Sequence, residues 1–396
     1  MTFNFGNKKV LFRGPVLTQS GYGVHARQVA RWLLEREDID LFFQVLPWGD
    51  TPWLLNRDLH DGLIGKVTDR TPDLTGKKFD VSFQLQLPNE WDPSLATYNV
   101  GMTASVETDI CNPEWIAACN AMSCVVVPSK HAEKSLTSSG KINVPIHIIP
   151  EAFSDAIVTN SSTSIDDLTF STNFNFLLFG QITGDNPEND RKNTFYAVKW
   201  FCEEFKNDRD VGLVIKTNLG KNTKIDRETT KNLFTKLLEE VRGSSPFPKI
   251  HLLHGDMSDE EVASLYRHNQ IKALLSATRG EGYGLPILEA AAAALPVIAT
   301  NWSGHVDFLS HGKFIDIDYK LDKVHPSRID QKIFMDGAKW AHPIESDFKK
   351  KTSKFRNADS IPREWAKDLS EKVRSIYSFE KIKIMYEACF GETLKS

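Results

Sequence analysis

The sequence predicts an α/β protein with two doubly wound, Rossmann-like domains that face a central cleft. Three observations favour this class. Short apolar or β-branched runs alternate with helical stretches along most of the chain, a polar stretch interrupts this alternation near the middle, and 396 residues exceed what one ordinary core accommodates. Ligands of such domains bind at the carboxyl ends of the parallel strands.

The first part of the chain contains apolar or β-branched runs that we expect to be strands of an N-terminal domain, residues 1–155. Amphipathic stretches at 23–36 and 131–139 separate several of these runs and are expected to be helices. The predicted strands are residues 9–14, 41–47, 79–86, 98–105, 124–129 and 146–150.

A stretch rich in Ser, Thr, Asp and Asn follows, and residues 156–173 are the predicted linker. The second domain, 174–375, resumes the alternation with continuously apolar strands, which suit a sheet buried on both faces. Its predicted strands are residues 175–180, 211–217, 249–255, 272–278, 296–300 and 313–317. Apolar residues at helical spacing follow Ile361, so 376–396 is expected to be a C-terminal helix that packs on the second domain or crosses back to the first.

The composition argues against several classes of protein. The chain has 48 Lys and Arg against 52 Asp and Glu, a net charge of −4, unlike a nucleic-acid-binding protein with a basic surface. No apolar run approaches the ~18 residues that span a bilayer, and the N-terminus lacks an apolar signal region. The five cysteines have no C-x-x-C spacing, so neither a disulfide framework nor a zinc site is expected. We therefore predict a cytoplasmic protein without stable membrane insertion.

The most informative segment, 272–304, runs from a predicted strand through a glycine-rich loop into a helix and a further strand. Gly280, Gly282 and Gly284 allow the backbone to approach a ligand closely, and Pro286 suits the first turn of a helix. The exposed N–H groups of a helix N-terminus form a site for a diphosphate.

Two carboxylates flank this predicted helix start. Glu281 lies in the loop, and Glu289 follows eight positions later, about one turn into the helix. Both can face one pocket, where they would accept hydrogen bonds from sugar hydroxyls. By spacing alone, a simple turn followed by a helix-start carboxylate is an equally good interpretation.

A family resemblance appears at residues 281–289, which read E-G-Y-G-L-P-I-L-E and continue as A-A-A-A-A-L-P-V-I-A-T-N-W-S-G. This resembles the E-x7-E signature of retaining glycosyltransferase family 4, within the glycosyl transferases group 1, which has the GT-B fold. Three further segments look like the same family: H-G-D-M-S-D-E-E-V-A-S-L-Y (254–266), V-V-V-P-S-K-H-A-E-K-S-L (125–136) with the later V-P-I-H-I-I-P-E-A-F, and G-P-V-L-T-Q-S-G-Y-G-V-H-A-R (14–27). The likeness is specific across 174–305, moderate across 8–31 and 98–153, and weak elsewhere.

The resemblance implies roles for the residues of this motif. Glu289 would hold the ribose hydroxyls of a nucleotide, and Glu281 would contact the transferred sugar. The diphosphate would lie against Gly282 and the amides of Tyr283, Gly284 and Leu285.

Members of the family also carry a cationic pair after the first strand of the second domain. Here Lys192 matches the family lysine, whereas Gln181 stands where many members have arginine, so Arg191 is the candidate for the missing charge. The intervening segment, 182–190, is longer and more polar than usual. As solvated charges, Arg191 and Lys192 would lie at the unfavourable end of a helix dipole, which favours phosphate binding.

The first domain contributes a glycine loop, in which Gly21, Tyr22 and Gly23 follow a strand and open a helix. The loop has the spacing of neither a dinucleotide fingerprint nor a P-loop. It is a tight turn or, opposite a diphosphate, a source of backbone N–H groups for the donor. His25 lies just inside the helix and is either structural or part of the acceptor side.

Glu107 and Asp109 resemble the E-T-D of a subset of the family and are candidates for the acceptor side. Helix capping is the other interpretation of these carboxylates.

Two other motifs are better explained without a ligand. Asp316 and Asp318 resemble a metal-binding D-x-D, but Asp38 and Asp40 repeat this pattern, so chance explains both and no metal site is expected. The basic run of Lys349, Lys350, Lys351, Lys354 and Arg356 is expected to be a solvated helix face rather than a nucleic-acid contact.

The resemblance and these residues together imply a retaining glycosyltransferase, a hexosyl- or pentosyltransferase that uses a UDP- or GDP-sugar by a same-face mechanism without a metal or other cofactor. Lys192, Arg191 and Glu281 are the predicted catalytic residues. The alternatives are a nucleotide-sugar epimerase or a phosphorylase on the same fold, a glycosyltransferase acting on modified nucleic acid, and a non-catalytic donor-binding protein. The sequence does not distinguish among glycans, lipids, proteins and modified nucleic acid as the acceptor.

Overall fold

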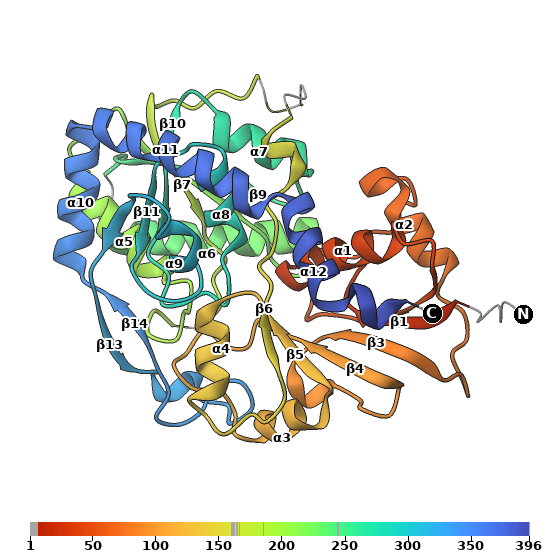
Figure 1. Cartoon of the computed structure of the whole chain (residues 1–396). Coiled ribbons are helices and arrows are strands. Elements are labelled where there is room, and N and C mark those ends of the chain that lie inside the picture. Colours follow the sequence, from red (N-terminus) through yellow and green to blue (C-terminus); the bar gives the residue numbers. More distant parts are fainter. Residues whose placement is uncertain are drawn as a thin grey trace, which may run out of the picture. The chain divides into compact units, whose positions relative to one another are not determined.

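The computed structural model describes residues 7–159, 163, 165, 167–184, 186–243 and 245–395. Contacts between Cα atoms divide the chain into two compact units, each built on a parallel sheet with helices packed on it (Figure 1). The first unit holds the described residues up to Val106, then Ile110–Ala152 and the segment from Phe379 onward; the second holds Glu107–Asp109 and Phe153–Ser378. Residues 160–162, 164 and 166 of the predicted linker lie outside the described residues. The predicted α/β class with two Rossmann-like units is confirmed.

The sheet of the first unit has the strand order β2-β1-β3-β4-β5-β6, and all neighbouring strands are parallel. Its strands lie where the sequence predicts them, with ends that differ by a few residues. The elements of this unit are β1 (Lys8–Gly14), α1 (Gly21–Leu34), β2 (Ile39–Val45), α2 (Leu59–Asp69), β3 (Phe79–Leu85), η1 (Pro88–Glu90), β4 (Ala96–Met102), α3 (Glu114–Ala121), β5 (Cys124–Val127), α4 (Lys130–Thr137), β6 (Ile146–Ile148) and α12 (Phe379–Leu394).

The C-terminal helix α12 packs on α1 (Figure 1). The rings of Trp32 and Tyr386 stack with their centroids 4.8 Å apart, and the indole N–H of Trp32 donates to Oε1 of Glu387 over 2.6 Å. The helical pattern after Ile361 forms two helices rather than one, because Ser378 has an extended conformation that ends the first of them.

The sheet of the second unit has the order β12-β11-β10-β7-β8-β9, again with parallel neighbours. The elements of this unit are η2 (Asp155–Ile157), β7 (Phe174–Phe179), α5 (Thr194–Glu204), β8 (Val211–Thr217), α6 (Lys224–Arg242), β9 (Lys249–His254), α7 (Asp259–Arg267), β10 (Ile271–Ser276), α8 (Leu285–Ala292), β11 (Val297–Thr300), α9 (Val306–Leu309), β12 (Ile315–Ile317), β13 (Tyr319–Lys323), η3 (Pro326–Arg328), β14 (Lys339–Pro343), α10 (Glu345–Asn357) and α11 (Ser360–Tyr377).

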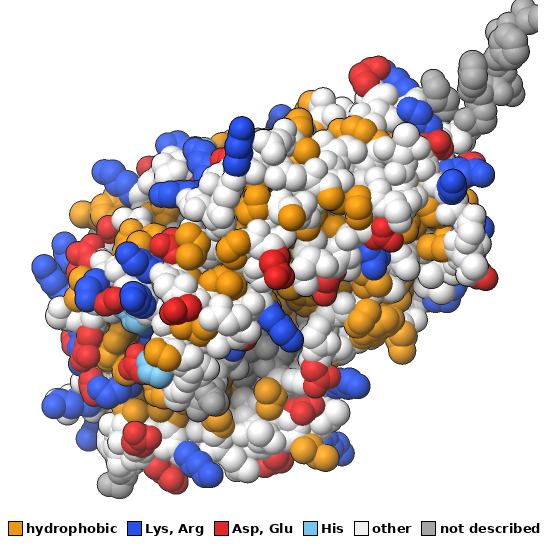
Figure 2. All heavy atoms as spheres, turned by 90° about the horizontal axis from the view of Figure 1, so that it is seen from below, with side chains coloured by type: hydrophobic (Ala, Val, Ile, Leu, Met, Phe, Trp, Pro, Cys, Tyr) orange, Lys and Arg blue, Asp and Glu red, His pale blue; other side chains and the backbone are white. Residues whose placement is uncertain are grey.

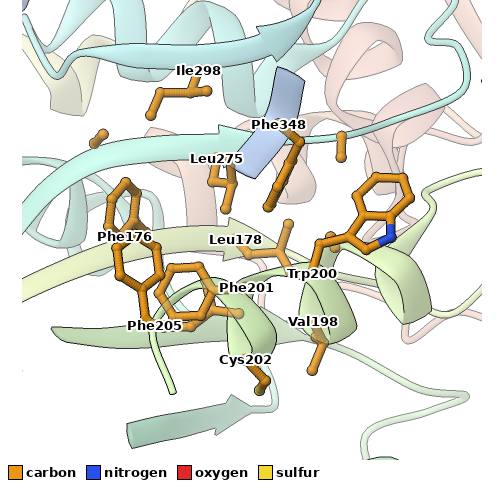
Figure 3. Packing of buried hydrophobic residues seen from close by; sticks show 14 of the residues in the cluster. Phe176, Leu178, Val198, Trp200, Phe201, Cys202, Phe205, Leu275, Ile298 and Phe348 are labelled. Atoms are coloured by element: carbon orange, nitrogen blue, oxygen red, sulfur yellow. The ribbon is translucent and has the colours of Figure 1, made fainter. Parts of the chain in front are cut away.

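An aromatic core holds α5 against this sheet. Figure 3 shows Phe201 of α5 and Phe205, which directly follows this helix, beside Phe176 of β7. The ring centroids of Phe201 and Phe176 lie 5.4 Å apart in an edge-to-face arrangement. All three rings are buried. Burial of both sheet faces explains why β7, β8 and β10 read as apolar runs without alternation.

The antiparallel pair β13–β14 was not predicted from the sequence. Its register joins Tyr319 to Pro343 and Lys323 to Lys339. The run YKLDK is mostly polar and exposed, so it carries no strand signal. The pairing depends on tertiary contacts around the buried Trp340 of β14 instead.

Charges of both signs are dispersed on the face drawn in Figure 2, where Lys and Arg side chains lie among Asp and Glu side chains. This distribution agrees with the nearly balanced composition of the chain. None of the helices that the structure describes combines the length and the apolarity needed to cross a membrane.

Candidate functional site

Lys192 and Glu281 form a close ion pair within the second unit. The ammonium nitrogen of Lys192 lies 2.7 Å from Oε1 and 2.8 Å from Oε2 of Glu281. The Lys192 side chain is 22% exposed and that of Glu281 only 9%. The two residues come from loops that follow β7 and β10, neighbouring strands of the sheet. The sequence placed both in one site, and the structure brings them together.

Arg191 joins this pair to a second carboxylate. Its Nη1 donates to the carbonyl oxygen of Gly280 over 2.8 Å and lies 3.3 Å from Oε2 of Glu281. Its Nε lies 3.3 Å from Oε1 of Glu107, which belongs to the same unit. Two cations and two carboxylates therefore share a small volume, and we call Lys192, Arg191, Glu281 and Glu107 the charge cluster.

The pKa shifts within the charge cluster follow from burial and pairing. Burial alone would raise the pKa of Glu281, but the charges of Lys192 and Arg191 outweigh it and lower that pKa to about 2. Burial lowers the pKa of Lys192 despite the attraction of Glu281. Burial also disfavours the charged form of Arg191, but Glu107 and Glu281 raise its pKa above the ordinary value. Glu281 is thus ionised and fixed between two cations.

The start of α8 lies beside the charge cluster, as the sequence predicts. Gly284 precedes the helix with a φ of +105°, a conformation that favours glycine, and Pro286 occupies the first turn. The ring of Tyr283 is buried, and its centroid lies 5.4 Å from the ring centroid of Phe308. The predicted ligand contact of Tyr283 therefore concerns its backbone amide. At Gly280, a Cβ atom would lie 2.3 Å from the carbonyl oxygen of Glu107, so only glycine permits this approach.

A pocket of about 350 Å³, including space open to solvent, adjoins these groups. Lys192, Glu281 and Gly284 line it together with Phe179 and Pro286. The pocket thus combines a cation, a carboxylate and the start of a helix.

Glu289 lies in α8, and its partner is Tyr266 of α7. The hydroxyl of Tyr266 donates to Oε2 of Glu289 over 3.1 Å. Burial and, to a smaller extent, Asp259 raise the pKa of Glu289 to about 7, against the opposing effect of that hydrogen bond.

The β7–α5 loop (Gly180–Asn193, with Asp185 outside the described residues) is organised by Asp190, which the sequence interpretation missed. Its buried carboxylate accepts from the N–H and hydroxyl of Thr183 over 3.0 and 2.8 Å and from the N–H of Thr194 over 2.6 Å.

Gln181 is exposed, and its carbonyl accepts from the Thr194 hydroxyl over 3.2 Å. The guanidinium near Glu281 thus comes from Arg191.

Two further residues at the site also escaped the sequence analysis. Ser303 accepts from the N–H of Glu281 over 2.8 Å and so holds the backbone of that carboxylate. Arg279 is 2% exposed, and its N–H donates to the carbonyl of Arg191 over 2.9 Å. In the sequence, Arg279 stands between an apolar strand and the glycine-rich loop, and this position is a signal that could have identified it.

The predicted residues of the first unit lie in and around the start of α1. The N–H of Gly23 donates to Oγ of Ser20 over 3.0 Å and so belongs to the helix cap, while Gly21 begins the helix. The Tyr22 hydroxyl accepts from the N–H of Ala104 over 3.0 Å, and the Tyr22 ring stacks on Trp48 with centroids 3.8 Å apart.

His25 lies inside the first unit. Its Nε2 is 3.2 Å from the hydroxyl of Tyr386, and its Nδ1 is 3.9 Å from Oε1 of Glu151. Burial lowers the pKa of His25 to about 4, so the ring is neutral near pH 7.

The other acidic candidates have structural partners. Asp109 accepts from the N–H of Lys339 over 2.7 Å and donates its own N–H to the Lys339 carbonyl over 2.9 Å. Asp316 and Asp318 lie 3.5 and 3.7 Å from the ammonium of Lys351. Within the described ranges, no group of three or more His, Cys, Asp or Glu side chains is placed to hold a metal ion.

One family model matches part of the sequence. Residues 247–320, which include Glu281 and Glu289, match the family model of the glycosyl transferases group 1. Among curated proteins, none matches the sequence of this chain.

Solved structures resemble the chain over nearly its whole length. Alr3699/HepE from Anabaena, in complex with UDP and glucose, has 12% identity and a TM-score of 0.62, with 97% of this chain and 100% of the other covered. Sucrose-phosphate synthase (tll1590) from Thermosynechococcus elongatus has 11% identity and a TM-score of 0.64, with coverage of 98% and 99%. WaaG, a glycosyltransferase involved in lipopolysaccharide biosynthesis, has 13% identity and a TM-score of 0.56, with coverage of 96% and 99%.

At these identities the likeness shows the fold, and the predicted GT-B fold is confirmed. This chain therefore has the GT-B fold and carries, over residues 247–320, the sequence pattern of the glycosyl transferases group 1.

Proposed function

We propose that the protein is a retaining glycosyltransferase of family 4 that moves a sugar from a nucleoside-diphosphate sugar to an acceptor without a metal ion. The family match over 247–320 supports the transferase class. Structures of the similar Alr3699/HepE are described in complex with UDP and with UDP-glucose, which supports a UDP-sugar ahead of a GDP-sugar as the first donor to test.

The observation that carries this proposal is the placement of Lys192 in a pocket next to the start of α8. The leaving group of such a transfer is a nucleoside diphosphate, which gains negative charge as the glycosidic bond breaks. Lys192, Arg191 and the N–H groups at the helix start are fixed donors for that charge, and such preorganised groups usually carry much of the catalytic effect. The Lys192–Glu281 pair holds the ammonium in place before the donor arrives.

The other residues take complementary roles in this mechanism. Glu289 accepts hydrogen bonds from ribose hydroxyls, Glu281 orients hydroxyls of the transferred sugar, and the amides of Tyr283, Gly284 and Leu285 contact the diphosphate. The bond from the anomeric carbon to the phosphate oxygen breaks, and the acceptor oxygen bonds to that carbon from the same face. Because the acceptor attacks from the face that the phosphate leaves, the configuration is retained, and the acceptor proton goes to the leaving phosphate oxygen.

Nucleotide binding tests the donor site first. A ligand at about 100 times its dissociation constant stabilises the folded state by about 2.7 kcal/mol, which corresponds to a melting shift of roughly 5–11 °C for a domain of this size. UDP, GDP, ADP and their sugar conjugates are the panel. If all of them leave the melting curve unmoved, the donor-site assignment fails.

Product analysis then tests the reaction. Mass spectrometry of a donor-by-acceptor panel is expected to show a product heavier than the acceptor by one sugar residue, with nucleoside diphosphate released in equal amount. Conversion of the donor sugar without an acceptor would indicate an epimerase, and consumption of free phosphate would indicate a phosphorylase.

A further inference from the structure

Arg279 is a buried cation that lies two positions before Glu281 in the loop after β10. Its Nε donates to the carbonyl of Asp190 over 3.2 Å, and its Nη2 donates to the carbonyl of Pro187 over 3.1 Å. Its Nη1 lies 2.5 Å from Nδ1 of His342 in β14. Three nitrogens of one guanidinium thus reach two backbone carbonyls of the β7–α5 loop and one imidazole of the β13–β14 hairpin.

Aromatic rings surround the same guanidinium. Its central carbon lies 5.5 Å from the ring centroid of Trp340 and 6.0 Å from that of Tyr196, distances at which a ring face attracts a cation. Nη2 also lies 3.9 Å from Oε2 of Glu188. Burial lowers the pKa of Arg279, yet arginine keeps its charge in proteins, so these partners offset the desolvation of a permanent cation.

The backbone of Arg279 also connects the β7–α5 loop to the β13–β14 hairpin. Its N–H donates to the Arg191 carbonyl over 2.9 Å, and its own carbonyl accepts from the N–H of Ala341 over 2.9 Å. Arg279 therefore lies between the segment that presents Arg191 and Lys192 and the hairpin strand β14.

The β7–α5 loop has few apolar side chains with which to hold its own shape. Its order depends on polar contacts: Asp190 binds Thr183, and the Thr183 hydroxyl accepts from the N–H of Arg191 over 2.9 Å. Two asparagines of the loop add contacts to the connection between β13 and β14, since Asn186 and Asn189 donate to Oγ of Ser327 over 3.2 and 3.1 Å.

We propose that Arg279 is a positioning residue for Arg191 and Lys192. It is held by Trp340 and His342 and binds the carbonyls of Pro187 and Asp190. Through these bonds it sets Arg191 and Lys192 in the arrangement that binds the donor diphosphate. The proposal rests on the proposed function of this site. Without the guanidinium, two carbonyls lose their donor and the loop is free to leave the position in which Lys192 meets Glu281. Arg279 acts through the loop and not on the substrate.

Three variants test this role. Arg279→Met removes the charge and the donors but keeps a long side chain. Arg279→Lys keeps the charge without the planar set of donors, and is expected to restore part of the effect. The matched control is Arg356→Met, which removes another ion-paired arginine of the second unit, bound to Asp208 and Asp210 rather than to the β7–α5 loop.

Amide hydrogen exchange is the readout that does not depend on activity. In Arg279→Met we expect the amides of Arg191 and Thr194 to exchange about tenfold faster or more, because several hydrogen bonds of the loop are lost, while the amides of β8 keep their protection.

UDP should bind about tenfold more weakly to Arg279→Met, with an intermediate loss in Arg279→Lys and wild-type affinity in Arg356→Met.

Three outcomes would overturn the proposal: unchanged exchange at Arg191 and Thr194, equal acceleration in β8, or wild-type UDP affinity with a loosened loop. Failure of the proposed function looks different. In that case the wild-type protein itself binds none of the nucleotides, while the exchange comparison still decides whether Arg279 holds the loop.

Discussion

The ammonium of Lys192 contacts both carboxylate oxygens of Glu281, at 2.7 and 2.8 Å, across 89 positions of sequence. Glu281 also lies 3.3 Å from Nη1 of Arg191, so one carboxylate orients two cations. A cation held in this way needs little reorganisation when negative charge develops nearby, which is the condition for efficient electrostatic stabilisation.

Removal of the Lys192 charge should act mainly on turnover. Its interaction strengthens as charge grows on the leaving group, so Lys192→Ala is expected to lower kcat by on the order of 10²–10³, with a smaller change in the donor KM. The control is Lys199→Ala, which removes the partly exposed pair of Lys199 with Glu203 on α5 and should leave kcat unchanged. Steady-state kinetics on folded variants provide the measurement. A Lys192→Ala enzyme with wild-type kcat and only a raised KM would contradict this role.

Glu281 should contribute to acid sensitivity. Its pKa is about 2 in the folded chain and near 4.5 in a model compound, so its contribution to stability is complete above about pH 4.5 and is lost as the pH falls towards 2. The melting-temperature difference between wild type and Glu281→Gln should therefore shrink over this range. Glu228→Gln, at an exposed position of α6, serves as the control. A difference that stays constant from pH 6 to pH 2.5 would show that Glu281 does not titrate as described.

Donor binding should depend on the ionisation of Glu289. Its pKa is raised to about 7, and only the carboxylate form accepts hydrogen bonds from two ribose hydroxyls. UDP affinity is expected to rise as the pH increases through 7, by up to about tenfold per unit below the pKa. Titrations of UDP from pH 5.5 to 8.5 measure this. Comparison with Glu289→Gln cancels the titration of UDP itself.

Tyr266→Phe extends the same experiment. Loss of the 3.1 Å hydrogen bond removes a group that favours the carboxylate form of Glu289, so the midpoint of the pH dependence should move upward. If Glu289→Gln keeps the wild-type pH dependence, Glu289 is not the titrating group.

Turnover should not require a divalent cation. Asp316 and Asp318, which form one of three D-x-D strings in the sequence together with Asp38–Asp40 and Asp208–Asp210, lie near the ammonium of Lys351. Activity in EDTA is expected to equal activity without it, and Asp316→Asn should have wild-type kcat. Loss of activity in EDTA that Mn²⁺ restores would contradict the metal-free mechanism.

Local features of the fold follow from the sequence alone. The apolar run of β8 predicts a strand buried on both faces, because each residue of such a strand meets a packed layer. Gly284 and Pro286 predict the start of α8, because the left-handed conformation and the first helical turn each favour those residue types. Strand positions and the start of α8 were predictable for this reason, whereas the GT-B class and the significance of the Glu281–Glu289 spacing came from the resemblance to a known family.

The partners of the polar side chains were decided only by the tertiary structure. His25 contacts Tyr386 at a separation of 361 positions, and Arg279 contacts a carbonyl of the β7–α5 loop and the imidazole of His342 in β14. The same holds for the β13–β14 pairing, whose polar strand has no periodic pattern. The periodicity of apolar residues indicates whether a position faces a core, because the side-chain direction depends on the local backbone. The choice of an ionic partner depends instead on which segments the whole fold brings within 3–4 Å of each other. No local sequence pattern encodes this choice.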